Sequence, residues 1–269
     1  AMLTGEPWPV AKHPGDKVTG ATLNITASAM QNSNSPSFNA IGTGIINLAG
    51  YTPNTVNFTK IGAGTLNLTG AASATSTPLI YEGTFNISGA GQLTATSGNI
   101  TVRNGALLNV DDTTGGPLTR IGGTARTLAM ETGNFAYTAN SAGSSQTLGV
   151  LTSSWGANRI TLNNAGTSAA TLTFASMTSN VVSGGSVLGF TSDQTLGAAT
   201  NRILFGTTAP TLTNNIITRA VVIDAGGVDL ATYAAAATPS ATTSNGSNIV
   251  TLASGSTVNL IVGQSVTNA

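Results

Sequence analysis

The sequence predicts an all-β protein, a parallel β-helix (solenoid) with coils of about 19–23 residues. The first observation behind this fold class is a short phrase, apolar-Asn-apolar after a small residue, that recurs through the first half of the chain. The second is the regular interval between its copies. The third is the composition: 33 glycines and only 7% charged residues in 269, with 40% hydrophobic residues to form a core.

The phrase occurs five times, and its central apolar residue marks each copy. These residues are Leu23, Ile46, Leu66, Phe85 and Leu108. Their spacings are 23, 20, 19 and 23 residues, and Leu128 in the segment RTLAM extends the series by 20. An interval of this size, repeated at fixed period, is typical of a solenoid in which each repeat forms one coil.

Within each phrase the apolar residues are two apart, which is the period of a β-strand. Leu66 and Leu68 therefore point to one face of the strand, and Asn67 points to the other. Stacked coils are expected to align the asparagines as an outward ladder and to stack the apolar neighbours inside. The predicted ladder consists of Asn24, Asn47, Asn67, Asn86 and Asn109.

Further short strands are expected between the phrases, separated by Gly, Ser, Asn or Pro. They are placed at 56–58, 79–81, 92–94, 99–102 and 118–121, and beyond residue 130 at 134–137, 159–162, 171–174, 186–190 and 202–205. The later phrases are irregular, which indicates coils of unequal length. The alternative architecture is a set of tandem antiparallel β-sandwiches, whose strands also recur at short intervals.

Four segments are expected along the chain. Residues 1–20, which contain three prolines and the single histidine, form an irregular leader or cap, and residues 21–233 form the β-helix. Residues 234–248 are a low-complexity linker rich in Ala, Ser and Thr. Residues 249–269 contain further β-strands that start another coil or form a contact segment.

The composition argues against several kinds of partner. The nine acidic and nine basic residues balance, so no strongly basic face for nucleic acid is expected. Every apolar run is interrupted within a few positions, so no membrane-spanning segment is expected. Cysteine is absent, which excludes disulfides and thiolate chemistry.

Catalytic and metal-binding residues are not expected. His13 is the only imidazole and lies in the Pro-rich leader, and no nucleophile elbow occurs. A polysaccharide-cleaving enzyme would need paired carboxylates, for which Asp111, Asp112 and Glu131 are the candidates. Adjacent strand residues point to opposite faces, so Asp111 and Asp112 make a poor dyad and indicate a turn. The same segment has few carboxylates for calcium.

A carbohydrate platform would be built from exposed aromatic rings. Trp8, Trp155 and the four tyrosines are scattered along the chain, which favours packing in the core or at corners over such a platform.

The segment Lys60–Gly70 reads Lys-x-Gly-x-Gly-Thr-Leu-x-Leu-x-Gly, and it is followed by Tyr81-x-Gly83 and Gly91-x-Leu93. In these residues the chain resembles the autotransporter-associated β-strand repeat. The family's usual Asn-Thr-Tyr-x-Gly-Gly-Thr-Thr stretch is replaced here by residues 76–84. The resemblance implies a right-handed parallel β-helix exported to the cell exterior as a passenger or fibre segment, and it supplies no catalytic residues.

The expected function is therefore that of a non-enzymatic extracellular structural or adhesive segment of a bacterial surface protein or fibre. Its expected partners are further copies of the chain stacked head to tail, or a cell-surface partner, with a glycan as another possible ligand. The alternative is a polysaccharide-binding or polysaccharide-cleaving β-helix protein. No cofactor is expected for either function.

Overall fold

The structure is a computed structural model of the whole chain. It describes residues 22–25, 37–49, 57–72, 77–95, 98–116, 119–164, 166, 168–178, 185–233, 241–243 and 250–252. The predicted leader, residues 1–20, lies outside these residues, as does most of the segment 234–269. All regular elements in the described part are β-strands, so the chain is all-β there.

Two large sheets contain most of the strands. In spatial order the ten-stranded sheet consists of β1 (Thr22–Ile25), β3 (Ile45–Leu48), β5 (Thr65–Leu68), β8 (Thr84–Ile87), β11 (Leu107–Asp111), β13 (Asn134–Ala139), β15 (Ala157–Asn164), β17 (Val187–Ser192), β21 (Ala220–Asp224) and β22 (Gly227–Leu230). The eight-stranded sheet consists of β2 (Ser37–Asn39), β4 (Thr59–Ile61), β7 (Leu79–Ile80), β10 (Gly98–Arg103), β12 (Arg126–Glu131), β14 (Ser144–Trp155), β16 (Ala170–Thr178) and β18 (Asn201–Phe205).

Three small pairs complete the described strands. They are the parallel pair β6 (Ala71–Ala72) and β9 (Gln92–Leu93), and the antiparallel pairs β19 (Leu212–Thr213) with β20 (Ile216–Ile217) and β23 (Ala241–Thr243) with β24 (Val250–Leu252). β23 lies within the range expected to be a linker, and β24 lies within the range expected to contain further strands.

The chain passes back and forth between the two large sheets. From β2 to β18 the strands that follow one another belong alternately to the eight- and ten-stranded sheets, apart from the short β6 and β9. Each strand pairs in parallel with the next strand of its own sheet, and antiparallel pairing in the large sheets is confined to β21 with β22. We call a strand of the ten-stranded sheet, with the preceding strand of the eight-stranded sheet, a rung.

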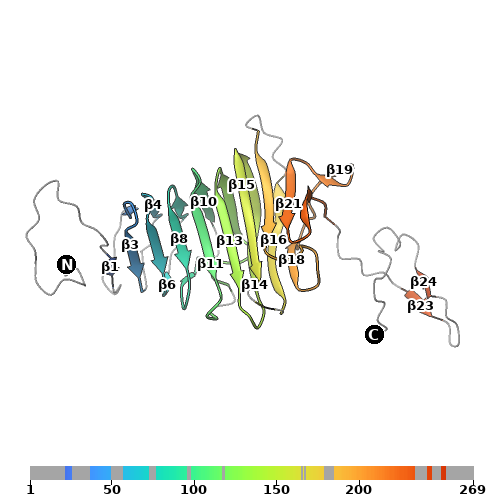
Figure 1. Cartoon of the computed structure of the whole chain (residues 1–269), viewed down its shortest axis with the longest axis horizontal. Coiled ribbons are helices and arrows are strands. Elements are labelled where there is room, and N and C mark those ends of the chain that lie inside the picture. Colours follow the sequence, from blue (N-terminus) through green and yellow to red (C-terminus); the bar gives the residue numbers. More distant parts are fainter. Residues whose placement is uncertain are drawn as a thin grey trace, which may run out of the picture.

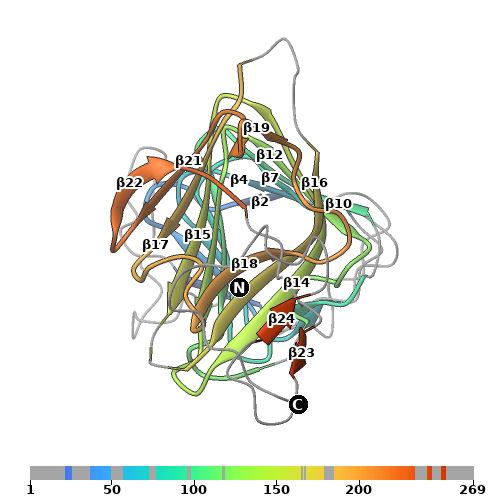
Figure 2. The same cartoon turned by 90° about the vertical axis from the view of Figure 1, so that its right-hand side faces the viewer.

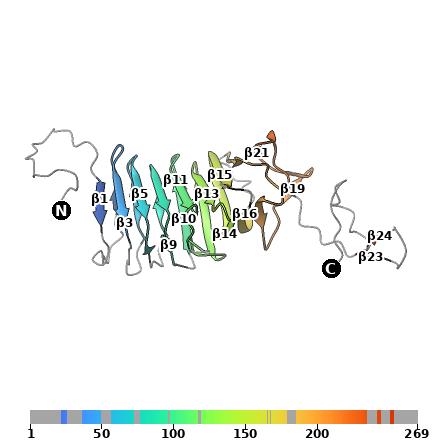
Figure 3. The same ribbon diagram turned by 60° about the horizontal axis from the view of Figure 1, so that its bottom comes forward.

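Successive rungs follow one another along the long axis of the molecule (Figures 1 and 3). Viewed along that axis, β15 and β17 lie on one side of the stack and β14 and β16 lie on the other (Figure 2). The inward side chains of both sheets form one buried cluster. This arrangement is compatible with a β-helix, whereas tandem antiparallel sandwiches would require hairpin pairing throughout both sheets.

The register confirms the predicted stacking of the repeated phrase. Leu66 stands opposite Ile46 on one side and Phe85 on the other, and Phe85 stands opposite Leu108. Leu66, Phe85 and Leu108 are each no more than 1% exposed. Because stacked strands satisfy each other's backbone groups, strands of four residues are stable here although they would not be in isolation.

The asparagine ladder is also confirmed. The five predicted asparagines are register neighbours from β1 to β11. Asn67 Nδ2 donates to Asn47 Oδ1 at 2.8 Å, Asn86 Nδ2 to Asn67 Oδ1 at 3.2 Å, and Asn109 Nδ2 to Asn86 Oδ1 at 2.8 Å. The side chains therefore repeat the hydrogen bonding of the backbone from rung to rung.

The extension of the series to Leu128 is wrong. Leu128 lies on β12 in the eight-stranded sheet, where it pairs with Ile100 and Leu151. The residue stacked on Leu108 is Phe135, 27 residues later in the chain. The coil is longer because residues 112–125 form an inserted loop, and the predicted strand at 118–121 is a turn in its described part.

Candidate functional site

The predicted turn after β11 separates its two carboxylates. Asp111 Oδ1 accepts hydrogen bonds from Thr113 N at 2.9 Å and Thr113 Oγ1 at 2.6 Å, which is the local turn chemistry that the sequence indicated. The Asp112 side chain turns into the protein and is only 4% exposed. The two groups do not form a catalytic pair.

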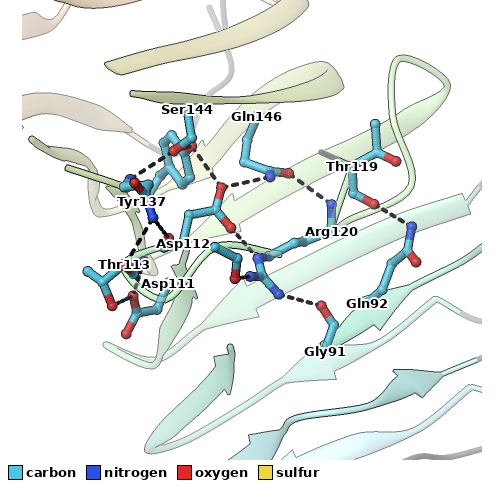
Figure 4. Close-up of polar contacts among 12 residues, drawn as sticks. Gly91, Gln92, Asp111, Asp112, Thr113, Thr119, Arg120, Tyr137, Ser144 and Gln146 are labelled. Carbon is cyan, nitrogen blue, oxygen red and sulfur yellow. Dashed lines mark hydrogen bonds and ion pairs between the residues drawn. The ribbon is translucent and has the colours of Figure 1, made fainter. Parts of the chain in front are cut away.

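Asp112 is the centre of a buried polar network (Figure 4). The guanidinium of Arg120, which is fully buried, forms an ion pair with Asp112 Oδ1 through Nε. Arg120 Nη1 donates to Gly91 O at 2.8 Å, and Nη2 donates to Gly115 O at 2.8 Å. Each guanidinium nitrogen thus has an oxygen partner, as a buried charge requires.

The second carboxylate oxygen of Asp112 accepts from two further rungs. Tyr137 OH donates to Asp112 Oδ2 at 2.9 Å, and Gln146 Nε2 donates to the same atom at 3.1 Å. Gln146 Oε1 accepts from Arg120 N at 3.0 Å, and Tyr137 OH lies 2.6 Å from Ser144 Oγ. Burial raises the pKa of Tyr137 well above its ordinary value, so its hydroxyl keeps its proton. The network holds the inserted loop against the stack.

A second buried charge lies at the motif Lys60-x-Gly62. Lys60 occupies an inward position of the eight-stranded sheet, opposite Ile80. Its Nζ donates to Ile61 O at 2.9 Å, Gly62 O at 2.7 Å and Glu82 O at 3.1 Å. Burial lowers the pKa of Lys60, and the charge of Glu82 raises it. The ammonium therefore closes two corners of the stack with all three of its hydrogens.

An exposed column of side chains follows the ends of four neighbouring strands of the eight-stranded sheet. It consists of Tyr81, Arg103, Glu131 and Trp155, which we call the aromatic-ionic column. Arg103 stands opposite Glu131, and Glu131 opposite Trp155. Tyr81 directly follows the pair Ile80 and Val102, which places it next to Arg103.

The column carries the charge pair in its middle and the rings at its ends. Arg103 Nε and Glu131 Oε2 are 2.6 Å apart, with 39% and 24% of the two side chains exposed. Tyr81 is 40% exposed and Trp155 is 52% exposed. The expectation that the aromatic residues are scattered is therefore wrong for these two, because distant chain segments meet in one column. Tyr137 is buried in the core.

The sequence contains a signal for this column. Each of its residues ends a strand just before a corner glycine, at Gly83, Gly105, Gly133 and Gly156. Trp155 deviates from the pattern because a bulge in β14 shifts the register between Met130 and Glu131. The bulge inserts Ser154, so that Trp155 instead of Ser154 stands opposite Glu131.

Other predicted site residues are not brought together. His13 and Trp8 lie outside the described residues, and Glu131 is on a different sheet from Asp111. Within the described part of the chain, no three His, Cys, Asp or Glu side chains are placed to hold a metal ion. Across the same residues, no helix is long and apolar enough to cross a membrane. A hollow of about 420 Å³ lies beside β9 and the turn at 122–125, and its lining includes Gln92, Thr94 and Thr119.

Comparison with models of protein families, with curated proteins and with solved structures gives no match for this chain. The candidate site therefore rests on the geometry of its own residues.

Proposed function

We propose that the chain is a parallel β-helix that serves as a non-enzymatic structural or adhesive segment of a bacterial surface protein or fibre, outside the cell. The fold part of this proposal is supported by the alternation of strands between two parallel sheets. The inserted loops fit coils of unequal length, since the loop at 112–125 lengthens one coil without interrupting the stack on either side.

One observation carries the functional part: the pairing of the ten-stranded sheet runs unbroken from β1 to β21. Nine parallel strands at the usual spacing give a stack about 40 Å long. In such a stack every internal strand has a hydrogen-bonded neighbour above and below, so the stack resists bending and acts as a spacer. Side-chain ladders such as the one through Asn67 and Asn86 add bonds in the same direction.

The charged groups support a structural role. Lys60, Arg120 and Asp112 are each within 5% of complete burial and bond to corner or loop groups. Charges held in this way position the backbone, while the outer surface relies on Asn, Thr and Ser. A neutral surface of this kind, together with the resemblance of Lys60–Gly70 to a repeat of exported passengers, favours the cell exterior.

The proposal concerns a single stack. β22 turns back antiparallel along β21 and occupies one edge of the ten-stranded sheet. A second copy cannot add in parallel to β21 without displacing β22, which disfavours head-to-tail stacking through that edge.

Antibodies against the purified chain test the location. They are applied to intact and to permeabilised cells of the source bacterium, with an antibody against a cytosolic protein as the control. Equal labelling of intact and permeabilised cells by the first antibody, with the control labelling permeabilised cells alone, is the expected result. Labelling only after permeabilisation overturns the proposal.

A further inference from the structure

We propose that the aromatic-ionic column, Tyr81, Arg103, Glu131 and Trp155, binds an extended neutral polysaccharide that lies along the stack. This inference rests on the proposed function and names the ligand class for an adhesive segment. It is carried by the exposure of both rings, by the ion pair between them and by the bulge that places Trp155 in the column.

The rings supply the apolar part of the contact. A tryptophan that is 52% exposed and a tyrosine that is 40% exposed leave ring surface in water, which a ligand can cover. Sugar rings present apolar C–H faces that stack on aromatic rings, with hydroxyl groups around their edges. Tyr81 and Trp155 are separated by three strand spacings, about 14 Å. A ligand that contacts both rings must therefore be a chain of several sugars.

The ion pair supplies the polar part. The contact between Arg103 Nε and Glu131 Oε2 uses one of the five guanidinium N–H groups and one carboxylate oxygen. Both side chains are partly exposed, so their other donors and acceptors can bond to hydroxyl groups. Few polar groups placed between apolar contacts are typical of sites that fix the orientation of a ligand.

The charge of the column selects the class of ligand. One positive and one negative side chain cancel, and the chain as a whole has a formal net charge of zero. A polyanion such as a nucleic acid would meet no basic surface here. A neutral polyhydroxylated chain loses little by binding at such a surface and can bond to both members of the ion pair.

The position of Trp155 is held from two sides. Its carbonyl oxygen accepts from Thr132 N at 3.0 Å and from Asn158 Nδ2 at 2.8 Å. Asn158 is itself buried, and its Oδ1 accepts from Gly133 N at 2.9 Å. The bulged segment is therefore fixed before a ligand arrives, which lowers the entropy lost on binding. Bulges are frequent next to functional sites, where they redirect one side chain.

Affinity electrophoresis of the whole chain tests the inference, with soluble hydroxyethyl cellulose and soluble mannan as neutral probes and heparin as the charged probe. We expect a neutral probe to retard the chain and heparin to leave its migration unchanged. Trp155→Ala and Tyr81→Ala are each expected to weaken the retardation at least tenfold. Leu230→Ala is the matched control, because Leu230 is 54% exposed on β22, and it is expected to bind like the unchanged chain.

Fluorescence provides a second readout. The chain has two tryptophans, so Trp8→Phe leaves Trp155 as the only indole, and its emission is expected to shift when the retarding probe is added. Circular dichroism checks that the variants fold. The inference is overturned if neither neutral probe retards the chain, if heparin is the stronger ligand, or if both aromatic variants bind normally. Surface labelling of intact cells together with any of these results refutes the column and leaves the proposed function standing.

Discussion

Removing the carboxylate of Asp112 is expected to destabilise the protein more than any surface change. Asp112→Ala leaves the fully buried guanidinium of Arg120 without its counter-charge and removes an acceptor from Tyr137 and Gln146. Loss of one partner of a buried ion pair costs about 3–5 kcal/mol. With a urea slope of about 3 kcal/mol/M, the unfolding midpoint is expected to fall by about 1–2 M.

The same chain provides an exposed ion pair as the control. Arg103 and Glu131 are partly exposed, so Glu131→Ala is expected to lower the free energy of unfolding by no more than about 1 kcal/mol. Urea unfolding of both variants, followed by circular dichroism at 25 °C, compares the two losses directly. The double variant Asp112→Leu with Arg120→Met removes both buried charges, and it is expected to recover most of the stability that Asp112→Ala loses.

Two results would refute this reasoning. One is that Asp112→Ala loses no more stability than Glu131→Ala, since the burial of the pair would then have no energetic effect. The other is a double variant as unstable as the single one, which would mean that the loss comes from a changed loop and not from an unpaired charge on Arg120.

Three other perturbations test the stack. Tyr137→Phe is expected to be less stable than the unchanged chain below pH 10, and this difference is expected to shrink above pH 10, because the unfolded tyrosine ionises there while burial raises the folded pKa; unfolding measured from pH 8 to 11 checks it. Asn86→Ala, which interrupts the ladder, is expected to cost about 1–2 kcal/mol in urea unfolding, against about 0.5 kcal/mol or less for its outward neighbour Thr84→Ala. Gly83→Ala is expected to lower the melting temperature much more than Gly105→Ala, since φ is positive at both but a Cβ overlaps carbonyl oxygens only at the first.

The regular part of the fold could be predicted from the sequence because each copy of the phrase carries its own instructions. A period of two within the phrase sets the inward and outward faces, and an interval of about twenty residues places like residues above one another. The hydrogen bonds from Asn109 back to Asn47 follow from these two periods alone. Nothing outside the repeat had to be known.

The irregular part could not be predicted in this way, because it depends on contacts between residues that no local pattern relates. Arg120 was assigned to a strand from its apolar neighbours, yet it lies in a turn and pairs with Asp112. This insertion also broke the periodic series, so Leu128 was assigned to the column of Leu108 and lies in the other sheet. A buried salt bridge leaves no periodic trace in a sequence.

The same distinction explains why the exposed column escaped the sequence analysis. Its residues share a place in the rung, at the strand end before a corner, and share no residue type; the bulge at Ser154 then shifts Trp155 by one position. Chains built from stacked rungs can thus vary one outward position per rung without disturbing the core, because the inward residues and the corner glycines maintain the register. A recognition surface on such a stack is therefore expected where unlike side chains interrupt the uniform Asn and Thr ladders, and Tyr81, Arg103, Glu131 and Trp155 do so in four consecutive rungs.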